Sequence, residues 1–419
     1  MSRPAGPGTG SDVLIIGGGV IGLAIAWRAA QLGLRVTVAD PEPGHGASHA
    51  AAGMLTPVSE AAYAERALFS LGQQSLQRYP AFVAELTAAT GEPTGFRDDG
   101  TLQVAYDHDD LAILDEIAIL RDSFGVTYQR LSARECRAAE PMLDPSVRGG
   151  LLVADDASVD PRLLTAALLA AARRAGADVI PQAATQVLTA AGRASGAALA
   201  DGTRVRASSV VLAAGWQSAL VGGLPDGAAP LVRPVKGQIL RLRPTPATLR
   251  AGIPAGLVTR TVRGIVHGCT VYLVPRLSGE LVIGATQEEL GSDTRVTAGA
   301  VWELLRDART LVPGITEFEL AEAVAGLRPG TPDNAPILGP ARLPGLVLAT
   351  GHFRSGVLLA PVTADIIADY LASQRISDGM VPFSAERFAR PDRPAGPRQT
   401  GPEPARRAAA AVPDERGRS

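Results

Sequence analysis

The glycine-rich segment from Gly17 to Gly22 restricts the fold of this chain more than any other feature of its sequence. It reads GGGVIG, which contains G-x-G-x-x-G, and lies between an apolar strand pattern over Ser11 to Ile16 and an apolar helix pattern over Val20 to Leu32. A second strand pattern follows over Arg35 to Asp40. The first glycine of this signature permits a tight turn, the second lets the backbone approach a pyrophosphate, and the third lets the helix pack on the sheet. We therefore predict a parallel βαβ unit that binds a dinucleotide.

Asp40 ends the second predicted strand, 18 residues after Gly22. A carboxylate at this place hydrogen-bonds both ribose hydroxyls and disfavours the 2′-phosphate of NADP, whereas FAD and NAD both stay compatible. The diphosphate is expected at the positive N-terminus of the helix that begins near Val20. The small residues from Gly46 to Met54 leave backbone amides free to line a phosphate or a flavin ring, or they form the start of an alanine-rich helix.

The length of the chain predicts more than one domain, because 419 residues exceed the size of an ordinary single core. Two helix patterns, 61–79 and 82–90, follow the βαβ unit, and from Arg233 to Thr286 the pattern changes to strands separated by turns. A strand is expected over Ile253 to Thr259, and a hairpin turn at Ser278-Gly279. The predicted fold class is an α/β Rossmann-type dinucleotide-binding domain plus an α+β substrate domain with a mostly antiparallel sheet.

Composition and charge argue against several classes of protein. The net charge is −2, which gives no support for binding to nucleic acid or to an anionic membrane. Cys136 and Cys269 are too few for a disulfide scaffold or a zinc cluster and suit a reducing compartment, so no metal is expected. The apolar run from Val13 to Ala30 is interrupted by glycines and has no cleavage site, which argues against a membrane span or a signal peptide. We expect a cytoplasmic protein whose Pro-, Arg- and Ala-rich residues 389–419 are a disordered tail.

Six segments carry a resemblance to a known family, and they occur in the family's order. They are VLIIGGGVIGLAIAW (Val13 to Trp27), GASHAAAGML (Gly46 to Leu55), VYLVPR (Val271 to Arg276), GAT (Gly284 to Thr286), GLRPGTPD (Gly326 to Asp333) and GHFRSGVLLAP (Gly351 to Pro361). Over residues 11–388 the chain resembles the D-amino-acid oxidase family of FAD-dependent amine oxidases, and within it the bacterial glycine oxidases. The first segment is common to many flavoproteins, whereas the last two together are specific.

The resemblance implies non-covalent FAD, because Gly326 stands where a related branch of the family carries the cysteine that attaches flavin. A helix that begins near Val357 would direct its positive end at the flavin and stabilise the reduced anion. We expect an FAD-binding domain of residues 11–90, 152–228 and 334–388 and a substrate-binding domain of residues 91–151 and 229–333. The implied cofactor contacts are Gly17, Gly19, Val20, Ile21, Gly22, Asp40, Ala47, Ser48, Ala52, Gly53, Met54, Val187, His352, Phe353, Arg354, Ser355, Gly356, Val357 and Leu358.

The resemblance also implies a site for a small amino acid. Arg328 would hold the substrate carboxylate, since a guanidinium group matches a carboxylate with two parallel hydrogen bonds, and Tyr272 would donate another. Pro329 favours an extended conformation of Arg328. Arg354 either contacts substrate or forms a structural ion pair, and Gln287 lies near the substrate where some glycine oxidases carry methionine.

No arrangement of His, Asp or Glu in the sequence indicates acid–base catalysis, and His352 is expected to be structural. This agrees with hydride transfer from a neutral amine, which needs orientation while the flavin carries the chemistry. The implied reaction oxidises glycine to glyoxylate and ammonia, and dioxygen is reduced to hydrogen peroxide. Sarcosine and small D-amino acids are further expected substrates. In the family this reaction often serves thiamine thiazole biosynthesis. A D-amino-acid oxidase or dehydrogenase of the same family and a non-catalytic flavin-binding protein are the alternatives. Homologues form oligomers, so a homo-oligomer is expected.

Overall fold

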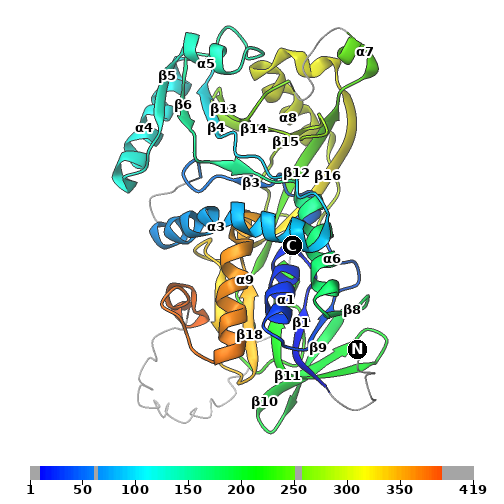
Figure 1. Ribbon diagram of the computed structural model, residues 1–419. Helices are drawn as coiled ribbons and strands as arrows, with labels where there is room; N and C mark the ends of the chain where they lie inside the picture. Colours follow the sequence, from blue (N-terminus) through cyan, green and yellow to red (C-terminus); the bar gives the residue numbers. More distant parts are fainter. Residues whose placement is uncertain (1–9, 61–64, 251–256, 389–419) are drawn as a thin grey trace, which may run out of the picture. The chain divides into compact units, whose positions relative to one another are not determined.

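The computed structural model describes residues 10–60, 65–250 and 257–388. Within these ranges, the residues up to Arg387 form one compact unit with two eight-stranded sheets and helices packed against them (Figure 1). The predicted tail at 389–419 lies outside the described residues, as do the first part of the strand expected from residue 253 and the first residues of the helix expected from residue 61.

The first sheet contains the predicted βαβ unit. Strand β1 (Ser11–Ile16) pairs in parallel with β2 (Val36–Ala39) and with β11 (Arg204–Leu212), and α1 (Val20–Gln31) connects β1 to β2. β1 is buried from Val13 onward, which is why its apolar residues run without alternation. The other strands of this sheet are β8 (Asp178–Ile180), β9 (Ala184–Ala190), β10 (Arg193–Leu199), β17 (Ile337–Pro340) and β18 (Leu346–Thr350).

Four helices share one apolar core with this sheet: α1, α3 (Arg66–Thr90), α6 (Pro161–Arg174) and α9 (Gly356–Ser373). Helix α1 lies beside α9 (Figure 1), and Trp27 of α1 packs edge to face on Phe82 of α3 with ring centroids 5.4 Å apart. Among the described residues, Phe353–Ser373 is the one helical stretch long and apolar enough to cross a membrane. However, 67% of its apolar window is buried inside the protein, which is the pattern of a core helix.

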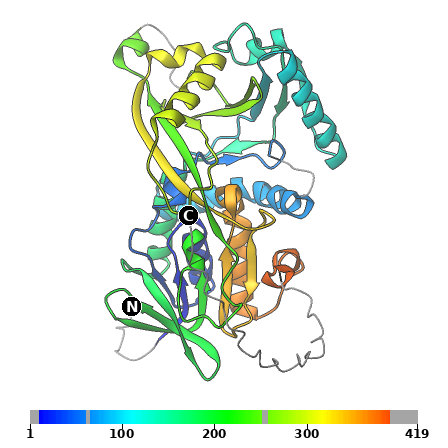
Figure 2. The ribbon, with the colours of Figure 1, turned by 180° about the vertical axis from the view of Figure 1, so that it is seen from behind.

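The second sheet is mostly antiparallel, as predicted. Its longest strands, β12 and β16, run side by side (Figure 2), and the hairpin expected at Ser278-Gly279 joins β14 to β15. Helix α8 (Ala298–Leu311) packs on the apolar core of this sheet, and α4 (His108–Phe124) packs on a smaller cluster beside it. The strands follow the order β16 (Glu319–Gly330), β12 (Arg233–Arg243), β15 (Leu281–Gly284), β14 (Cys269–Pro275), β13 (Thr261–Val266), β4 (Thr101–Ala105), β6 (Gly149–Val153) and β5 (Gln129–Ser132).

The strands of the first sheet come from residues 11–212 and 337–350, and those of the second sheet from 101–153 and 233–330. The expected boundaries of the FAD-binding and substrate-binding domains stay a prediction.

The shorter elements are α2 (Ala47–Ala50), α5 (Ala133–Ala139), α7 (Pro246–Arg250), the two-stranded sheet of β3 (Met54–Leu55) and β7 (Ala157–Ser158), and the 3-10 helices η1 (Gly215–Ala219), η2 (Pro313–Glu317), η3 (Phe353–Ser355), η4 (Val381–Phe383) and η5 (Ala385–Phe388).

The strand expected over 253–259 is wrong in its described part, because residues 257–259 are not extended into any sheet. The strand of this region is β13, which follows at Thr261–Val266. Arg263 and Gly264 interrupt its apolar pattern, but β13 lies between β14 and β4, and pairing on both sides outweighs a weak local propensity.

The two helices expected at 61–79 and 82–90 form, from Arg66 onward, the single helix α3, which continues through Pro80. Proline lacks an N–H and pushes against the preceding turn, so it usually ends or bends a helix. Pro80 is exposed, whereas its neighbours Tyr79 and Phe82 are buried in the core. Packing on both sides of Pro80 therefore keeps the two halves of α3 together.

A buried proline, Pro361, lies inside α9. Because proline has no N–H, the carbonyl of Val357, four residues earlier, loses its helical donor. The hydroxyl of Tyr79 in α3 donates to this carbonyl at 2.6 Å, and the hydroxyl of Ser75 donates to the carbonyl of Leu358 at 2.6 Å. Helix α3 therefore supplies hydrogen bonds near the N-terminal end of α9, one of which α9 cannot make itself.

Candidate active site

A cavity of about 950 Å³ extends from the glycine-rich loop after β1 to one face of the second sheet. Its wall includes residues of the loop between β2 and β3, of strands β4, β12, β13, β14 and β16, and of the segment that leads into α9. The cavity therefore connects the predicted dinucleotide site with the strands that carry the predicted substrate residues.

Close backbone contacts explain the glycines of the β1–α1 loop. Gly17 has a φ of +107°, and a β-carbon there would lie 2.5 Å from the carbonyl oxygen of Ala213, just after β11. A β-carbon at Gly22 would overlap the carbonyl oxygen of Gly17. The amide of Val20 donates to the hydroxyl of Ser48 at 3.0 Å. The first hydrogen bond of the helix runs from the amide of Leu23 to the carbonyl of Gly19, so the amides of Ile21 and Gly22 have no acceptor within the helix, as a diphosphate site requires.

Asp40 follows β2 and lines the cavity. Its Oδ2 accepts a hydrogen bond from the amide of Gly18 at 2.6 Å, and its Oδ1 accepts one from the amide of Glu42 at 2.8 Å. The carboxylate thus joins the glycine-rich loop to the chain after β2, a role that the sequence did not predict. Each oxygen can accept a further hydrogen bond, and contact with ribose hydroxyls stays a prediction.

A buried arginine holds the small-residue segment that follows α2. Arg276, which follows β14, is 4% exposed; its Nη2 donates to the carbonyl of Ala52 at 2.6 Å and its Nη1 to that of Val159 at 3.0 Å. Burial lowers the pKa of Arg276 to about 10, against the opposing effect of Asp160, so the guanidinium is charged at neutral pH. The alanine-rich stretch contains the short helix α2, as one interpretation predicted, and its residues line the cavity, while contact of its amides with a phosphate or a flavin stays a prediction.

Arg328 and Tyr272 lie at the end of the cavity next to the second sheet, which is the expected substrate end, and each side chain lies over a glycine. The Nη1 of Arg328 donates to the carbonyl of Thr286 at 3.1 Å and to that of Lys236 at 3.4 Å. A β-carbon at Gly237 would overlap this guanidinium, and one at Gly284 would overlap the phenol of Tyr272. Burial raises the pKa of Tyr272, while the nearby charge of Arg328 acts in the opposite direction, so the phenol is protonated and can donate a hydrogen bond at neutral pH.

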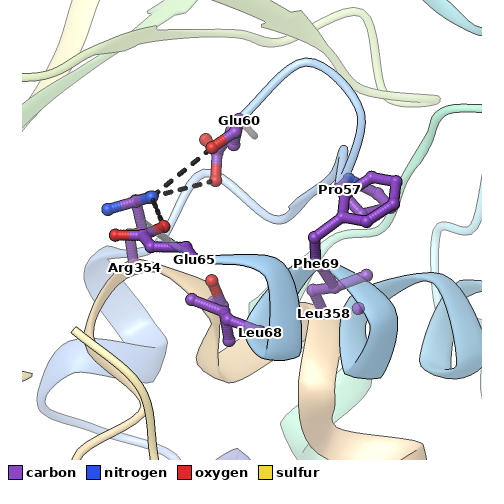
Figure 3. Close-up of a pocket in the computed structure, with 9 residues that line it drawn as sticks. Pro57, Glu60, Glu65, Leu68, Phe69, Arg354 and Leu358 are labelled. Atoms are coloured by element: carbon purple, nitrogen blue, oxygen red, sulfur yellow. Dashed lines mark hydrogen bonds and ion pairs between the residues drawn. The ribbon is translucent and has the colours of Figure 1, made fainter. Parts of the chain in front are cut away.

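Arg354, in η3, lines the cavity and also a smaller pocket beside it, in which its guanidinium contacts the carboxylates of Glu60 and Glu65 (Figure 3). Its Nη2 donates to Glu65 at 2.5 Å, and its Nε lies 3.8 Å from Glu60. Of the two roles considered for Arg354, the structure contains the ion pair. Glu60 is also bound by Arg263, whose Nη1 lies 2.9 Å from its Oε1.

His352 is buried, with Nε2 3.1 Å from the hydroxyl of Thr363 in α9. Burial lowers the pKa of His352 to about 3, so the imidazole is neutral at all physiological pH values. It lines the cavity as a neutral hydrogen-bonding group.

Most of the predicted site residues line this one cavity. Four do not: Gly22 packs beneath the loop, Ser355 and Leu358 face a smaller pocket, and the amide of Val187 donates to Gly222 inside the sheet while residues 183–185 line the cavity instead. The predicted residues that line it are Gly17, Gly19, Val20, Ile21, Asp40, Ala47, Ser48, Ala52, Gly53, Met54, Tyr272, Gln287, Arg328, His352, Phe353, Arg354, Gly356 and Val357.

Three polar residues at the substrate end were not predicted: Glu60, Gln103 in β4 and Arg263 in β13. Gln103 and Arg263 are neighbours because β4 and β13 pair in parallel, although they are far apart in the sequence. A polar residue inside an otherwise apolar strand is the only local signal that could have indicated either of them.

A glycine-rich loop at the head of a helix, joined through one cavity to an arginine–tyrosine pair, defines an oxidoreductase with a dinucleotide cofactor. Residues 12–370 match the DAO family, described as FAD dependent oxidoreductase, and the chain belongs to this family. The predicted FAD cofactor and oxidoreductase class are thereby confirmed. The loop amides and the close approach at Gly17 and Gly22 fit an FAD diphosphate.

Two relatives and one solved structure show how close the similarity is. The chain is 36% identical over 383 residues to the bifunctional protein ThiO/ThiG of Synechocystis sp., covering 91% of this chain and 54% of that protein. It is 35% identical over 382 residues to the glycine oxidase of Geobacillus kaustophilus, covering 90% and 97%. The crystal structure of glycine oxidase from Geobacillus kaustophilus matches with a TM-score of 0.82 at 33% identity, covering 90% of this chain and 99% of that one. The chain spans about half the length of the bifunctional relatives.

Proposed function

We propose that this protein oxidises glycine, together with sarcosine or small D-amino acids, at the α-carbon. Glycine, dioxygen and water give glyoxylate, ammonia and hydrogen peroxide: the α C–H and an N–H bond break, two electrons leave the substrate, and water hydrolyses the imine. FAD, when bound, accepts the hydride and transfers the electrons to dioxygen. We also propose that the protein is cytoplasmic and that it serves thiamine thiazole synthesis, and the similarity to the bifunctional protein ThiO/ThiG supports the second of these.

The observation that carries this proposal is the pair of Arg328 and Tyr272 at one end of the cofactor cavity. Because two backbone carbonyls hold Nη1 of Arg328, the orientation of the guanidinium is set before substrate arrives. Donors on Nε and Nη2 and the protonated phenol of Tyr272 then match a carboxylate. Fixing the carboxylate fixes the neighbouring C–H, and such orientation is a main source of rate enhancement.

Among the described residues near the substrate, no carboxylate or imidazole is free to act as a general base. Glu60 and Glu65 are paired with arginines, and His352 is neutral and buried. The residues of this site therefore act by binding and orienting an amine that loses its proton before oxidation.

FAD is proposed to bind without a covalent bond to the protein. Gly326 has no side chain that could attach flavin, and a β-carbon there would lie 2.6 Å from the β-carbon of Ala50 in α2.

A D-amino-acid oxidase or dehydrogenase of the same family is the second candidate function. Gln287 favours it, because this polar residue lines the cavity where a different small amine could bind.

Replacing Arg328 with alanine tests the proposal. The loss of charge-assisted hydrogen bonds, roughly 1.5–3 kcal/mol, should raise the Kd of glycine by about 10- to 150-fold while FAD stays bound. The measurement is anaerobic bleaching of the flavin spectrum as glycine is titrated. Arg130→Ala, which removes an exposed arginine from β5 of the same sheet, is the matched control. Unchanged glycine affinity in Arg328→Ala, or a wild-type flavin that no small amine reduces, would contradict the proposed function.

A further inference from the structure

The cavity has a second polar end, formed by Arg263 and its neighbours. Arg263 of β13 pairs with Gln103 of β4 and with Tyr272 of β14, and directly paired residues on adjacent strands project to the same face of a sheet. All three line the cavity. They form a polar row with Arg263 in the middle, and Arg263 lies on the far side of Tyr272 from Arg328.

The distance from Arg328 to the far part of this row is longer than a bound glycine molecule. Strands β13 and β12 are three strand spacings apart, roughly 14 Å, and the guanidinium of Arg328 lies over Gly237 of β12. Burial dominates the pKa of Tyr272, but the charges of Arg328, Glu60 and Arg263 also shift it, so all three lie within electrostatic reach of this phenol. A substrate on Arg328 therefore leaves room towards Arg263.

Arg263 has hydrogen-bond donors that no described residue uses. Its Nη1 donates to Glu60 at 2.9 Å and lies 3.8 Å from the sulfur of Met54. Its Nε and Nη2 make no hydrogen bond within the described ranges, and its side chain is 19% exposed. The Nε–Nη2 edge of a guanidinium is a planar fork that matches a carboxylate.

The charges at this end of the cavity favour a ligand with a net negative charge. The lining side chains and their ion-pair partners are three arginines and two glutamates, Arg263, Arg328, Arg354, Glu60 and Glu65, which leaves one positive charge uncompensated. Glycine with the neutral amine that the proposed oxidation requires carries one negative charge, and its carboxylate balances the charge of Arg328. The Nε–Nη2 edge of Arg263 then still lacks an acceptor among the described residues, and a second carboxylate would supply one where water is excluded.

Building on the proposed amine oxidation, we propose that the site prefers amino acids that carry a second carboxylate. The α-carboxylate binds Arg328 and Tyr272, and the second carboxylate binds the Nε–Nη2 edge of Arg263. Arg263 is then a specificity-determining residue, and Glu60, which holds its Nη1, is a positioning residue. Bond breaking and electron transfer are those of the proposed reaction, with the second carboxylate unchanged.

The test compares two classes of substrate on the FAD-loaded protein. The diacids are iminodiacetate, D-aspartate and D-glutamate, and the monoacids are sarcosine, glycine and D-alanine; kcat/KM comes from oxygen consumption, and flavin reduction from anaerobic spectra. We expect at least one diacid to exceed its monoacid counterpart tenfold or more in kcat/KM. Arg263→Met should lower this diacid-to-monoacid ratio at least tenfold, because a charge-assisted contact is lost. Arg130→Met, in the same sheet, should leave the ratio unchanged.

The two proposals fail in different ways. If monoacids reduce the flavin and Arg263→Met lowers kcat/KM equally for both classes, or for neither, the diacid preference is wrong and the amine oxidation stands. If no amine of either class reduces the flavin of the wild-type protein, the proposed function is wrong. FAD content and Tm of each variant show that it is folded, and Arg263→Lys, which keeps the charge but not the fork, should recover part of the ratio.

Discussion

At the scale of single residues, glycines determine where the functional side chains lie. Gly237 and Gly284 leave the space that the guanidinium of Arg328 and the phenol of Tyr272 occupy. The sequence indicated Arg328 and Tyr272 because each lies in a recognisable segment. It did not indicate Gly237 or Arg263, because their positions depend on which strands pair and in which register, and local patterns carry no such information.

Gly237→Ala is expected to displace the guanidinium of Arg328 and to raise the KM for glycine about tenfold, which corresponds to about 1.4 kcal/mol. FAD content should not change, because Gly237 faces the substrate end. Steady-state kinetics with glycine measure the effect. Gly299→Ala is the matched control, since a β-carbon at that position in α8 meets no atom within 4 Å. An unaltered KM in Gly237→Ala would show that the guanidinium does not need this space.

At the scale of elements, α3 and α9 depend on each other through hydrogen bonds that substitute for helical ones. The apolar pattern over Val20 to Leu32 predicted α1 well, and the helix expected to begin near Val357 is α9, which begins at Gly356. The continuity of α3 through Pro80 was not predicted, since it results from packing against α9 and α6 rather than from propensity. The substitution of Tyr79 for the missing amide of Pro361 was equally invisible in the sequence.

Tyr79→Phe should lower the free energy of unfolding by about 1–3 kcal/mol, because it leaves the buried carbonyl of Val357 without a donor. In the Pro361→Ala background the helix regains its own amide donor, so the same change should have a smaller effect. Chemical denaturation of the four proteins of this double-mutant cycle measures the coupling. Equal effects of Tyr79→Phe in both backgrounds would show that the tyrosine does not replace the proline amide.

At the scale of the whole molecule, the two sheets are built from interleaved segments, and a buried carboxyl lies beside the second sheet. The sequence predicted the two architectures because strand and helix periods differ, but it could not show that β4, β5 and β6 join the later strands of the second sheet. It also did not indicate Asp156, which is fully buried and accepts a hydrogen bond from Ser59 at 2.5 Å.

Asp156 should make stability depend on pH. Burial raises its pKa to about 7, although Ser59 and Arg121 oppose the shift, whereas the unfolded carboxyl ionises near 3.8. The unfolded chain therefore releases this proton first, and the stability contributed below about pH 4 is lost as pH rises towards 7. Asp156→Asn should remove the loss, so the difference in unfolding free energy between Asp156→Asn and wild type should grow with pH by up to about 4 kcal/mol.

Thermal and denaturant unfolding of the FAD-loaded proteins between pH 4 and 8 measure this difference. Asp115→Asn, which replaces a 51% exposed aspartate paired with Arg130, is the control for the substitution itself. A difference between Asp156→Asn and wild type that stays constant or shrinks with rising pH would contradict the expectation.

The position of β18 and α9 late in the chain determines when the protein can acquire its cofactor during synthesis. A ribosome releases β1, α1 and every strand of the second sheet before it releases Leu346–Thr350 and Gly356–Ser373. Until then β11 lacks its outer neighbour β18, and the apolar faces of α1 and α3 lack α9. We therefore expect FAD to bind late in biogenesis, and nascent chains that stall before α9 to expose the apolar faces of α1 and α3 to chaperones and proteases.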